Sequence, residues 1–168
     1  MNVTDAVKDR LGTVVTKVVG AASGYGHPQS VTIARPREDV ERLWRDPRRL
    51  SRVFGDVASV SSEDGHRFEW RLGSHGSETG TWTTTLTEGP GTLRFTGTEA
   101  AGAALQLNFR DAPRGLGTEV TLSVLAPIAD VLTDTAAFAV LYRARALLQT
   151  GEIPTLAGNP SARASSDE

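Results

Sequence analysis

The feature that most limits what this chain can fold into is a two-residue period of hydrophobicity that runs through residues 56–126. In one segment Phe68, Trp70 and Leu72 alternate with charged side chains, and four further segments alternate in the same way. This pattern is typical of strands that bury one face and expose the other to water. Turn-forming stretches, such as Glu-Gly-Pro-Gly at residues 88–91, separate the segments. The sequence therefore predicts six consecutive strands in an antiparallel meander.

Other patterns flank the meander. A short strand is expected over residues 30–35, and two short helices are expected over residues 36–54, with Pro36 in the first turn of one of them. A long helix is expected from about Asp130 to Gln149, with Gly151 as its C-terminal cap. A curved antiparallel sheet leaves one apolar face uncovered, and only this last helix is long enough to cover it. The expected fold class is therefore α+β.

The first 20 residues carry a separate amphipathic pattern. Val3, Val7, Leu11, Val14 and Val18 share one face of a helix. An isolated helix of this length and composition is unstable in water, so we expect the face to dock on its own domain, on a second copy in a homodimer, or on a membrane. The helix lacks the basic face of membrane-surface helices, so membrane contact is expected to be transient at most.

The chain is thereby divided into three parts. Residues 1–26 form the N-terminal helix and a linker, residues 27–155 form the folded domain, and residues 156–168 form a small, polar tail that we expect to be disordered. A length of 168 residues suits one such domain.

Composition narrows the classes of function. The chain has no cysteine, which excludes disulfides and thiolate chemistry, and its net charge of -2 gives no general attraction to nucleic acid. No apolar run approaches the roughly 20 residues that cross a bilayer, so we expect a cytoplasmic protein. His27, His66 and His75 each lack a second ligand at metal-binding spacing, and phosphate-loop and dinucleotide motifs are absent. We therefore expect no metal and no cofactor.

Arginines are concentrated around the two short helices. Four acidic residues nearby offset four of the seven charges. We interpret this group as a solvated helix face rather than as a site for an anionic partner. The seven are Arg35, Arg37, Arg42, Arg45, Arg48, Arg49 and Arg52.

A more specific signal lies in residues 43–60. Leu-Trp-Arg-Asp at residues 43–46, followed by Leu50, Phe54 and later valines, resembles the Trp-x-Asp…Leu-Pro-x-Phe…Val motif of the bacterial coenzyme-Q-binding-like cyclase/dehydrase family. Trp70 and Trp82 match the tryptophans on the following strands, and Gly-Thr-Glu-Val at residues 117–120 resembles the family's late strand. Two departures are Ser51, where the family usually has proline, and Val53, where it usually has phenylalanine.

This resemblance places the chain with the START/polyketide-cyclase (SRPBCC) superfamily. It implies a helix-grip fold, in which a curved seven-stranded antiparallel sheet wraps a long C-terminal helix. It also implies a hydrophobic small molecule held between sheet and helix: a lipid, an isoprenoid quinone or a polyketide-like compound. Polar anchors for that ligand are expected at Thr84, Asn108, Tyr142 and Arg145.

The expected ligand-binding residues are the aromatic and apolar side chains of the inner face with a few polar neighbours. They are Trp44, Phe54, Phe68, Trp70, Trp82, Thr84, Phe95, Leu107, Phe109, Phe138, Leu141, Tyr142 and Arg145. No catalytic residue is assigned, because the inward strand positions are nearly all apolar. Two alternatives remain open. One is a polyketide aromatase/cyclase, which needs a positioned acid or base. The other is a ligand-free interaction protein that docks through its N-terminal helix.

Overall fold

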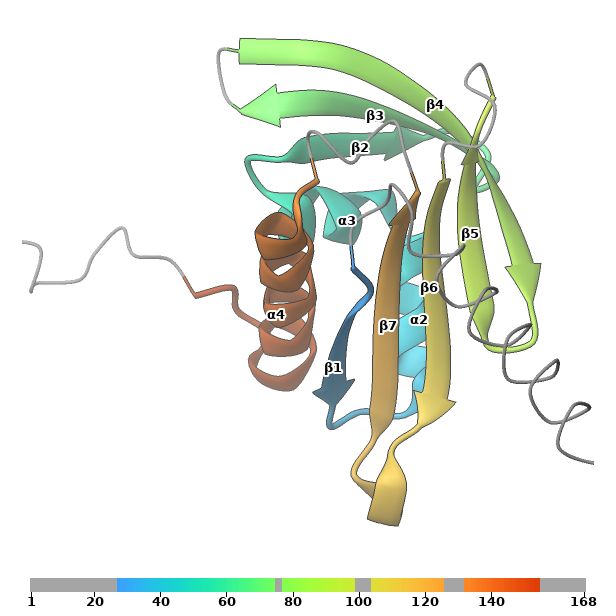
Figure 1. Cartoon of the computed structure of the whole chain (residues 1–168), viewed down its shortest axis with the longest axis vertical. Helices are drawn as coiled ribbons and strands as arrows, with labels where there is room; N and C mark the ends of the chain where they lie inside the picture. Colours follow the sequence, from blue (N-terminus) through green and yellow to red (C-terminus); the bar gives the residue numbers. More distant parts are fainter. Residues whose placement is uncertain (1–26, 75–76, 99–103, 126–131, 155–168) are drawn as a thin grey trace, which may run out of the picture.

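Figure 1 shows the computed structural model, which describes residues 27–74, 77–98, 104–125 and 132–154. The N-terminal helix expected in residues 1–20 and the tail of residues 156–168 lie outside these ranges. The elements in chain order are β1 (Gln29–Ile33), α2 (Arg37–Arg45), α3 (Pro47–Phe54), β2 (Ala58–Ser62), β3 (Arg67–Ser74), β4 (Ser77–Gly89), β5 (Thr92–Gly97), β6 (Ala104–Asp111), the 3-10 turn η1 (Pro113–Gly115), β7 (Thr118–Leu125) and α4 (Asp134–Thr150).

The strands form one seven-stranded sheet in the order β1-β7-β6-β5-β4-β3-β2, and every neighbouring pair is antiparallel. Strands β2 to β7 are the predicted meander, and β1 joins it beside β7. Figure 1 shows the sheet curving, with β2, β3 and β4 bent over toward the side that α4 occupies. The predicted α+β fold, a curved sheet with a long C-terminal helix, is confirmed.

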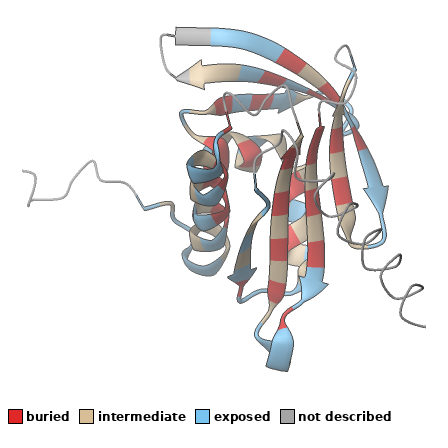
Figure 2. Ribbon diagram, in the orientation of Figure 1, coloured by how far each residue is buried: buried red, intermediate tan, exposed pale blue. Residues whose placement is uncertain are grey.

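The alternation seen in the sequence becomes the burial pattern of the sheet. In β7, Val120, Leu122 and Val124 are buried and alternate with half-buried neighbours. Figure 2 shows the same alternating bands along the other strands. The buried side chains of all seven strands join those of the helices in a single hydrophobic core, because every strand presents its apolar set to the same face.

The helices α2 and α3 carry the chain from β1 to β2, which are the two edges of the sheet. Helix α2 has Glu38 and Asp39 in its first turn, where the helix dipole favours negative charge. Helix α3 begins at Pro47, and the side chain of Asp46 caps it by accepting from the backbone N–H groups of Arg48 and Arg49.

Ser51, which stands where the motif described above usually has proline, has a structural role in this chain. Its hydroxyl donates to the carbonyl oxygen of Val60 at 2.9 Å and accepts from the backbone N–H of Val60 at 2.7 Å. These are backbone groups of the edge strand β2, so the serine of α3 covers an edge that would otherwise be open to pairing. A proline at this position could not make either bond.

Helix α4 begins later than the sequence suggested. We expected a start near Asp130, but the helix begins at Asp134, because Thr133 is its N-cap and accepts from the backbone N–H of Ala136. It ends at Thr150, and Gly151 is the predicted cap, with a left-handed φ of 78°. None of the helices in the described ranges is long and apolar enough to cross a membrane.

Gly117 permits the close approach of β1 and β7. Its φ is 117°, and a Cβ on this residue would overlap the carbonyl oxygen of Ile33. The next residue, Thr118, is buried and donates its hydroxyl proton to the carbonyl oxygen of Arg35. This pair of residues therefore fastens the edge strand to the body of the sheet.

Candidate functional site

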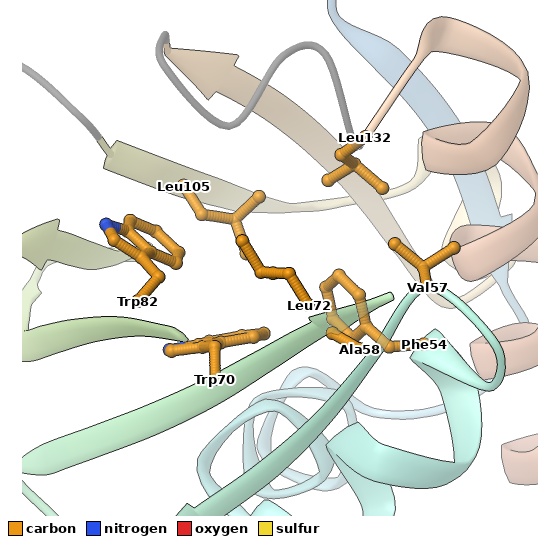
Figure 3. Close-up of a pocket in the computed structure, with 8 residues that line it drawn as sticks. All are labelled: Phe54, Val57, Ala58, Trp70, Leu72, Trp82, Leu105 and Leu132. Carbon is orange, nitrogen blue, oxygen red and sulfur yellow. The ribbon is translucent and has the colours of Figure 1, made fainter. Parts of the chain in front are cut away.

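An apolar pocket lies at one end of the strands, on the inner face of the sheet. The residues that line it are Phe54 from α3, Val57 and Ala58 where β2 begins, Trp70 and Leu72 from β3, Trp82 from β4, Leu105 from β6, and Leu132 just before α4. Figure 3 shows Trp70 and Trp82 at one end of the pocket and Val57 and Leu132 at the other.

The free space inside this pocket is small. It amounts to about 10 Å³, which is roughly the space of one water-sized sphere. The lining side chains are apolar apart from the two indole N–H groups, so the space suits an apolar atom better than a water molecule. The interior at this point is closed by side chains rather than held open.

Aromatic rings build the wall of the pocket. The ring of Trp70 lies 5.1 Å from that of Phe54, 5.6 Å from that of Trp82 and 5.3 Å from that of Phe95, measured between centroids. The contacts with Phe54 and Phe95 are edge-to-face, a favoured arrangement of aromatic pairs. The two tryptophans are direct partners across β3 and β4, so the strand register brings them together.

The indole groups differ in their hydrogen bonding. Trp70 Nε1 donates to the hydroxyl of Thr84 at 2.9 Å, and both residues are buried. Trp82 Nε1 and Trp44 Nε1 are buried and have no partner among the described residues. Figure 3 shows the nitrogen of Trp82 on the side of the ring away from Leu132, so it does not point into the pocket.

Ten of the thirteen predicted ligand-binding residues are buried and separate into three groups. Phe54, Trp70 and Trp82 line the pocket. Thr84 does not line the pocket, but its hydroxyl accepts a hydrogen bond from the indole N–H of Trp70, which does. The third group is buried in the core but does not line the pocket: Trp44, Phe68, Phe95, Leu107, Phe109 and Leu141.

Four expectations need correction. Phe138 and Tyr142 are each 50% exposed, and Arg145 is exposed as well, so these three residues lie on the outer side of α4 rather than between helix and sheet. Ala137 and Leu141 face inward instead, one residue away from each aromatic. Asn108, on the outer face of the sheet, interacts with Thr92 and Gln106 and is no anchor for an internal ligand.

Sequence reasoning missed five lining residues. Val57, Ala58, Leu72, Leu105 and Leu132 come from four separate stretches, and none is aromatic. The usable signal was position along the strands, because the starts of β2, β4 and β6 and the end of β3 lie at the same end of an antiparallel sheet. Leu132 gave no such signal, because the sequence placed it in the first turn of the long helix, whereas in the structure it precedes α4.

Buried polar chemistry is scarce in the part of the chain that the structure describes. Apart from the tryptophan indoles, the only polar side chains buried there are Thr84 and Thr118, and both hydroxyls are engaged in hydrogen bonds. No group of three potential metal ligands occurs in these residues. No acidic or basic side chain is fully buried among the described residues.

Comparison with known proteins identifies the fold. No family of known proteins matches the sequence, and no curated protein matches it either. Solved structures do match. DR_A0006 from Deinococcus radiodurans is 23% identical, with 74% of this chain and 97% of that one covered and a TM-score of 0.59. CV1439 from Chromobacterium violaceum is 18% identical, with 73% and 96% covered and a TM-score of 0.58.

A third similar structure is the Aha1 dimer from Colwellia psychrerythraea. It is 12% identical, with 74% of this chain and 96% of that one covered and a TM-score of 0.55. These likenesses support the helix-grip type of fold expected from the sequence.

Proposed function

We propose that this domain binds a small hydrophobic molecule between the sheet and α4, and that the molecule enters at the pocket beside Trp70 and Trp82. The observation that carries the proposal is the lining, which consists of aliphatic and aromatic side chains throughout. A ligand that leaves water for such a surface gains about 25 cal/mol per Å² of apolar area. The helix-grip fold and the motif in residues 43–60 support a lipid, an isoprenoid quinone or a polyketide-like ring compound as the ligand class.

Binding requires the pocket to widen. Sites for drug-sized molecules hold about 300–1,000 Å³, whereas the free space here is about 10 Å³. Leu72 and Val57 are only half-buried at the edge of the pocket. Val57 is branched at Cβ and Leu72 is not, so Leu72 changes rotamer more freely. We therefore expect a ligand to displace Leu72 first.

A pair of neighbouring substitutions on β2 tests the proposal. Ala58 is buried in the pocket wall, and Ser59 is exposed on the opposite face of the same strand. The neutral probe N-phenyl-1-naphthylamine should bind the native protein saturably, with a dissociation constant of about 10 μM, and raise its own fluorescence. Ala58→Leu fills the space and should abolish this binding. Ser59→Leu adds the same side chain outside and should leave it intact.

Two controls make the result decisive. Circular dichroism must show that Ala58→Leu still folds, because overpacking a core typically costs about 1–3 kcal/mol. The native protein should also show saturable quenching of tryptophan emission by menadione or lauric acid. If neither ligand nor the probe binds the native protein saturably, the proposal is wrong.

The second candidate is a ligand-free interaction protein. The filled interior favours it, and so do Phe138 and Tyr142, which lie one turn apart on the outer side of α4 and are half exposed. Light scattering coupled to size exclusion distinguishes the two candidates. A stable oligomer, together with failure of every ligand in the panel above, would favour the interaction protein.

A further inference from the structure

The arginines around the short helices do not form one uniform surface. Arg37 pairs with Asp111 at 3.4 Å, and Arg45 pairs with Glu88 at 2.7 Å and with Glu41. These two side chains are therefore directed to carboxylates of their own.

Four of the arginines line one groove on the surface. The groove encloses about 370 Å³ between the start of α2, the length of α3 and the C-terminal end of α4. Its residues are Arg35, Asp39, Arg42, Arg49, Arg52, Leu147, Leu148 and Gly151. Four guanidinium groups thus share one concavity with a single lining carboxylate, which corrects the interpretation of the group as a plain solvated helix face.

The fold itself uses only part of this positive charge. Arg35 Nε donates to the carbonyl oxygen of Leu148 at 2.9 Å, which satisfies an acceptor at the negative end of the α4 dipole. Arg42 lies 3.4 Å from Asp39, and Arg49 lies 3.6 Å from Asp46, whose carboxylate also caps α3. Arg52 forms no ion pair or hydrogen bond within the described residues, although it lines the same groove.

Such a cluster fits a doubly charged anion. A phosphate monoester carries a charge of about -1.5 to -2 at neutral pH and presents three acceptor oxygens. Guanidinium groups bind these oxygens in pairs with a planar fork, a geometry that lysine does not offer. Binding an anion would also relieve the mutual repulsion of the four arginines.

The volume of the groove and its apolar side limit the size and the chemical class of the ligand further. A volume of about 370 Å³ is at the lower end of small-molecule sites, which hold about 300–1,000 Å³. Leu147 and Leu148 are half-buried, and they give one side of the groove an apolar surface. The chain as a whole has a net charge of -2, so a long polyanion would meet repulsion beyond the groove.

We propose that this groove binds a small phosphate monoester, with the phosphate among Arg42, Arg49 and Arg52 and the organic part against Leu147 and Leu148. The site is separate from the apolar pocket, with which it shares no lining residue. The proposal for the groove can therefore be right or wrong independently of the function proposed above.

The probe for this site is phenyl phosphate, added to the full chain and followed by isothermal titration and by amide shifts in NMR. We expect saturable binding with a dissociation constant of about 1 mM or lower, and shifts centred on the amides of Arg52, Leu148 and Gly151. Phenol, the neutral counterpart, should not bind. Raising the salt from about 50 to about 200 mM should weaken the interaction, because the groove is open to solvent.

The chain provides a matched pair of variants. Arg52→Gln removes a groove charge that forms no ion pair or hydrogen bond among the described residues, and Arg48→Gln removes an exposed charge from the same helix outside the groove. Arg52→Gln should weaken binding severalfold, and the double variant Arg42→Gln/Arg52→Gln should weaken it at least about tenfold. Arg48→Gln should change it less than about twofold.

Three results would overturn the proposal. The first is the absence of saturable binding up to about 10 mM phenyl phosphate. The second is an equal effect of Arg48→Gln and Arg52→Gln, which would indicate a diffuse charge effect. The third is failure of phenyl phosphate together with cosedimentation on phosphatidylcholine vesicles that contain phosphatidic acid, lost in Arg42→Gln/Arg52→Gln. That outcome would make the groove a membrane contact instead.

Discussion

The hydroxyl of Thr84 is the acceptor for the indole of Trp70, at a place where the surrounding side chains are apolar. Thr84→Val keeps the shape of the side chain and removes this acceptor. The buried N–H would then have no partner, so we expect the free energy of unfolding to fall by about 1–3 kcal/mol. Urea unfolding followed by circular dichroism measures the change.

Thr83 supplies the control for that substitution. It is the neighbour of Thr84 in β4, lies on the other face and is half-buried. Thr83→Val should alter the free energy of unfolding by less than about 0.5 kcal/mol. Equal losses in the two variants would show that the Trp70–Thr84 hydrogen bond contributes nothing specific.

Helix α4 has one side in the core and one side in water, so residues that are adjacent in its sequence can differ sharply in exposure. Leu141 is fully buried, and Tyr142 is half exposed. Leu141→Ala should lower the free energy of unfolding by about 2–5 kcal/mol, because it leaves a cavity against the sheet. Tyr142→Ala, in the same turn, should cost less than about 1 kcal/mol. The reverse order in thermal or chemical denaturation would mean that the helix is rotated from the position described.

The same helix shows what the sequence could specify and where it failed. The spacing of Ala137, Leu141, Ala144 and Leu148 predicts one inward stripe; the first three are buried and Leu148 is half-buried. Phe138 and Tyr142 flank this stripe and were expected to contact a ligand between helix and sheet, but both are half exposed. Small side chains bring a helix close to a sheet, however, and the aromatic rings one position away are then turned outward.

Strands were easier to predict than the pocket they form. Alternation identifies which face of a strand is buried, and the inward positions of Trp70, Trp82 and Thr84 follow from it. Which side chains meet across strands depends on register, and the register of β3 and β4 shifts between Leu72 and Gly73. Alternation alone does not give the register, so it does not show that Leu72 and Leu105 meet Trp82 in one pocket.

At the scale of the whole molecule, the point where the chain enters the described domain is tied to α4. The backbone N–H of His27 donates to Asp134 Oδ1 at 2.9 Å, and His27 Nδ1 lies 3.1 Å from Asp134 Oδ2. Asp134 is in the first turn of α4, one turn before Phe138 and two before Tyr142. His27, the first described residue, is therefore held at the helix that carries the half-exposed aromatic pair.

This geometry sharpens the prediction for the N-terminal segment. The apolar stripe from Val3 to Val18 needs a surface, and the helix that His27 contacts presents one, around Phe138 and Tyr142. We expect this segment to dock there, on its own domain or on a second copy of the chain. Deleting residues 1–20 should then expose apolar surface, so the melting temperature should fall and hydrophobic dye should bind more strongly.

The control for this deletion is the same truncation in a Phe138→Ser/Tyr142→Ser background. If the segment covers these two rings, removing it from the doubly substituted protein should change dye binding much less, because the surface it covers is no longer apolar. Light scattering on the full chain and the truncated one separates docking within one molecule, which leaves the mass per particle at one chain, from docking between two copies. If deletion leaves the particle mass, melting temperature and dye binding unchanged in the native background, the segment has no docking site on this domain.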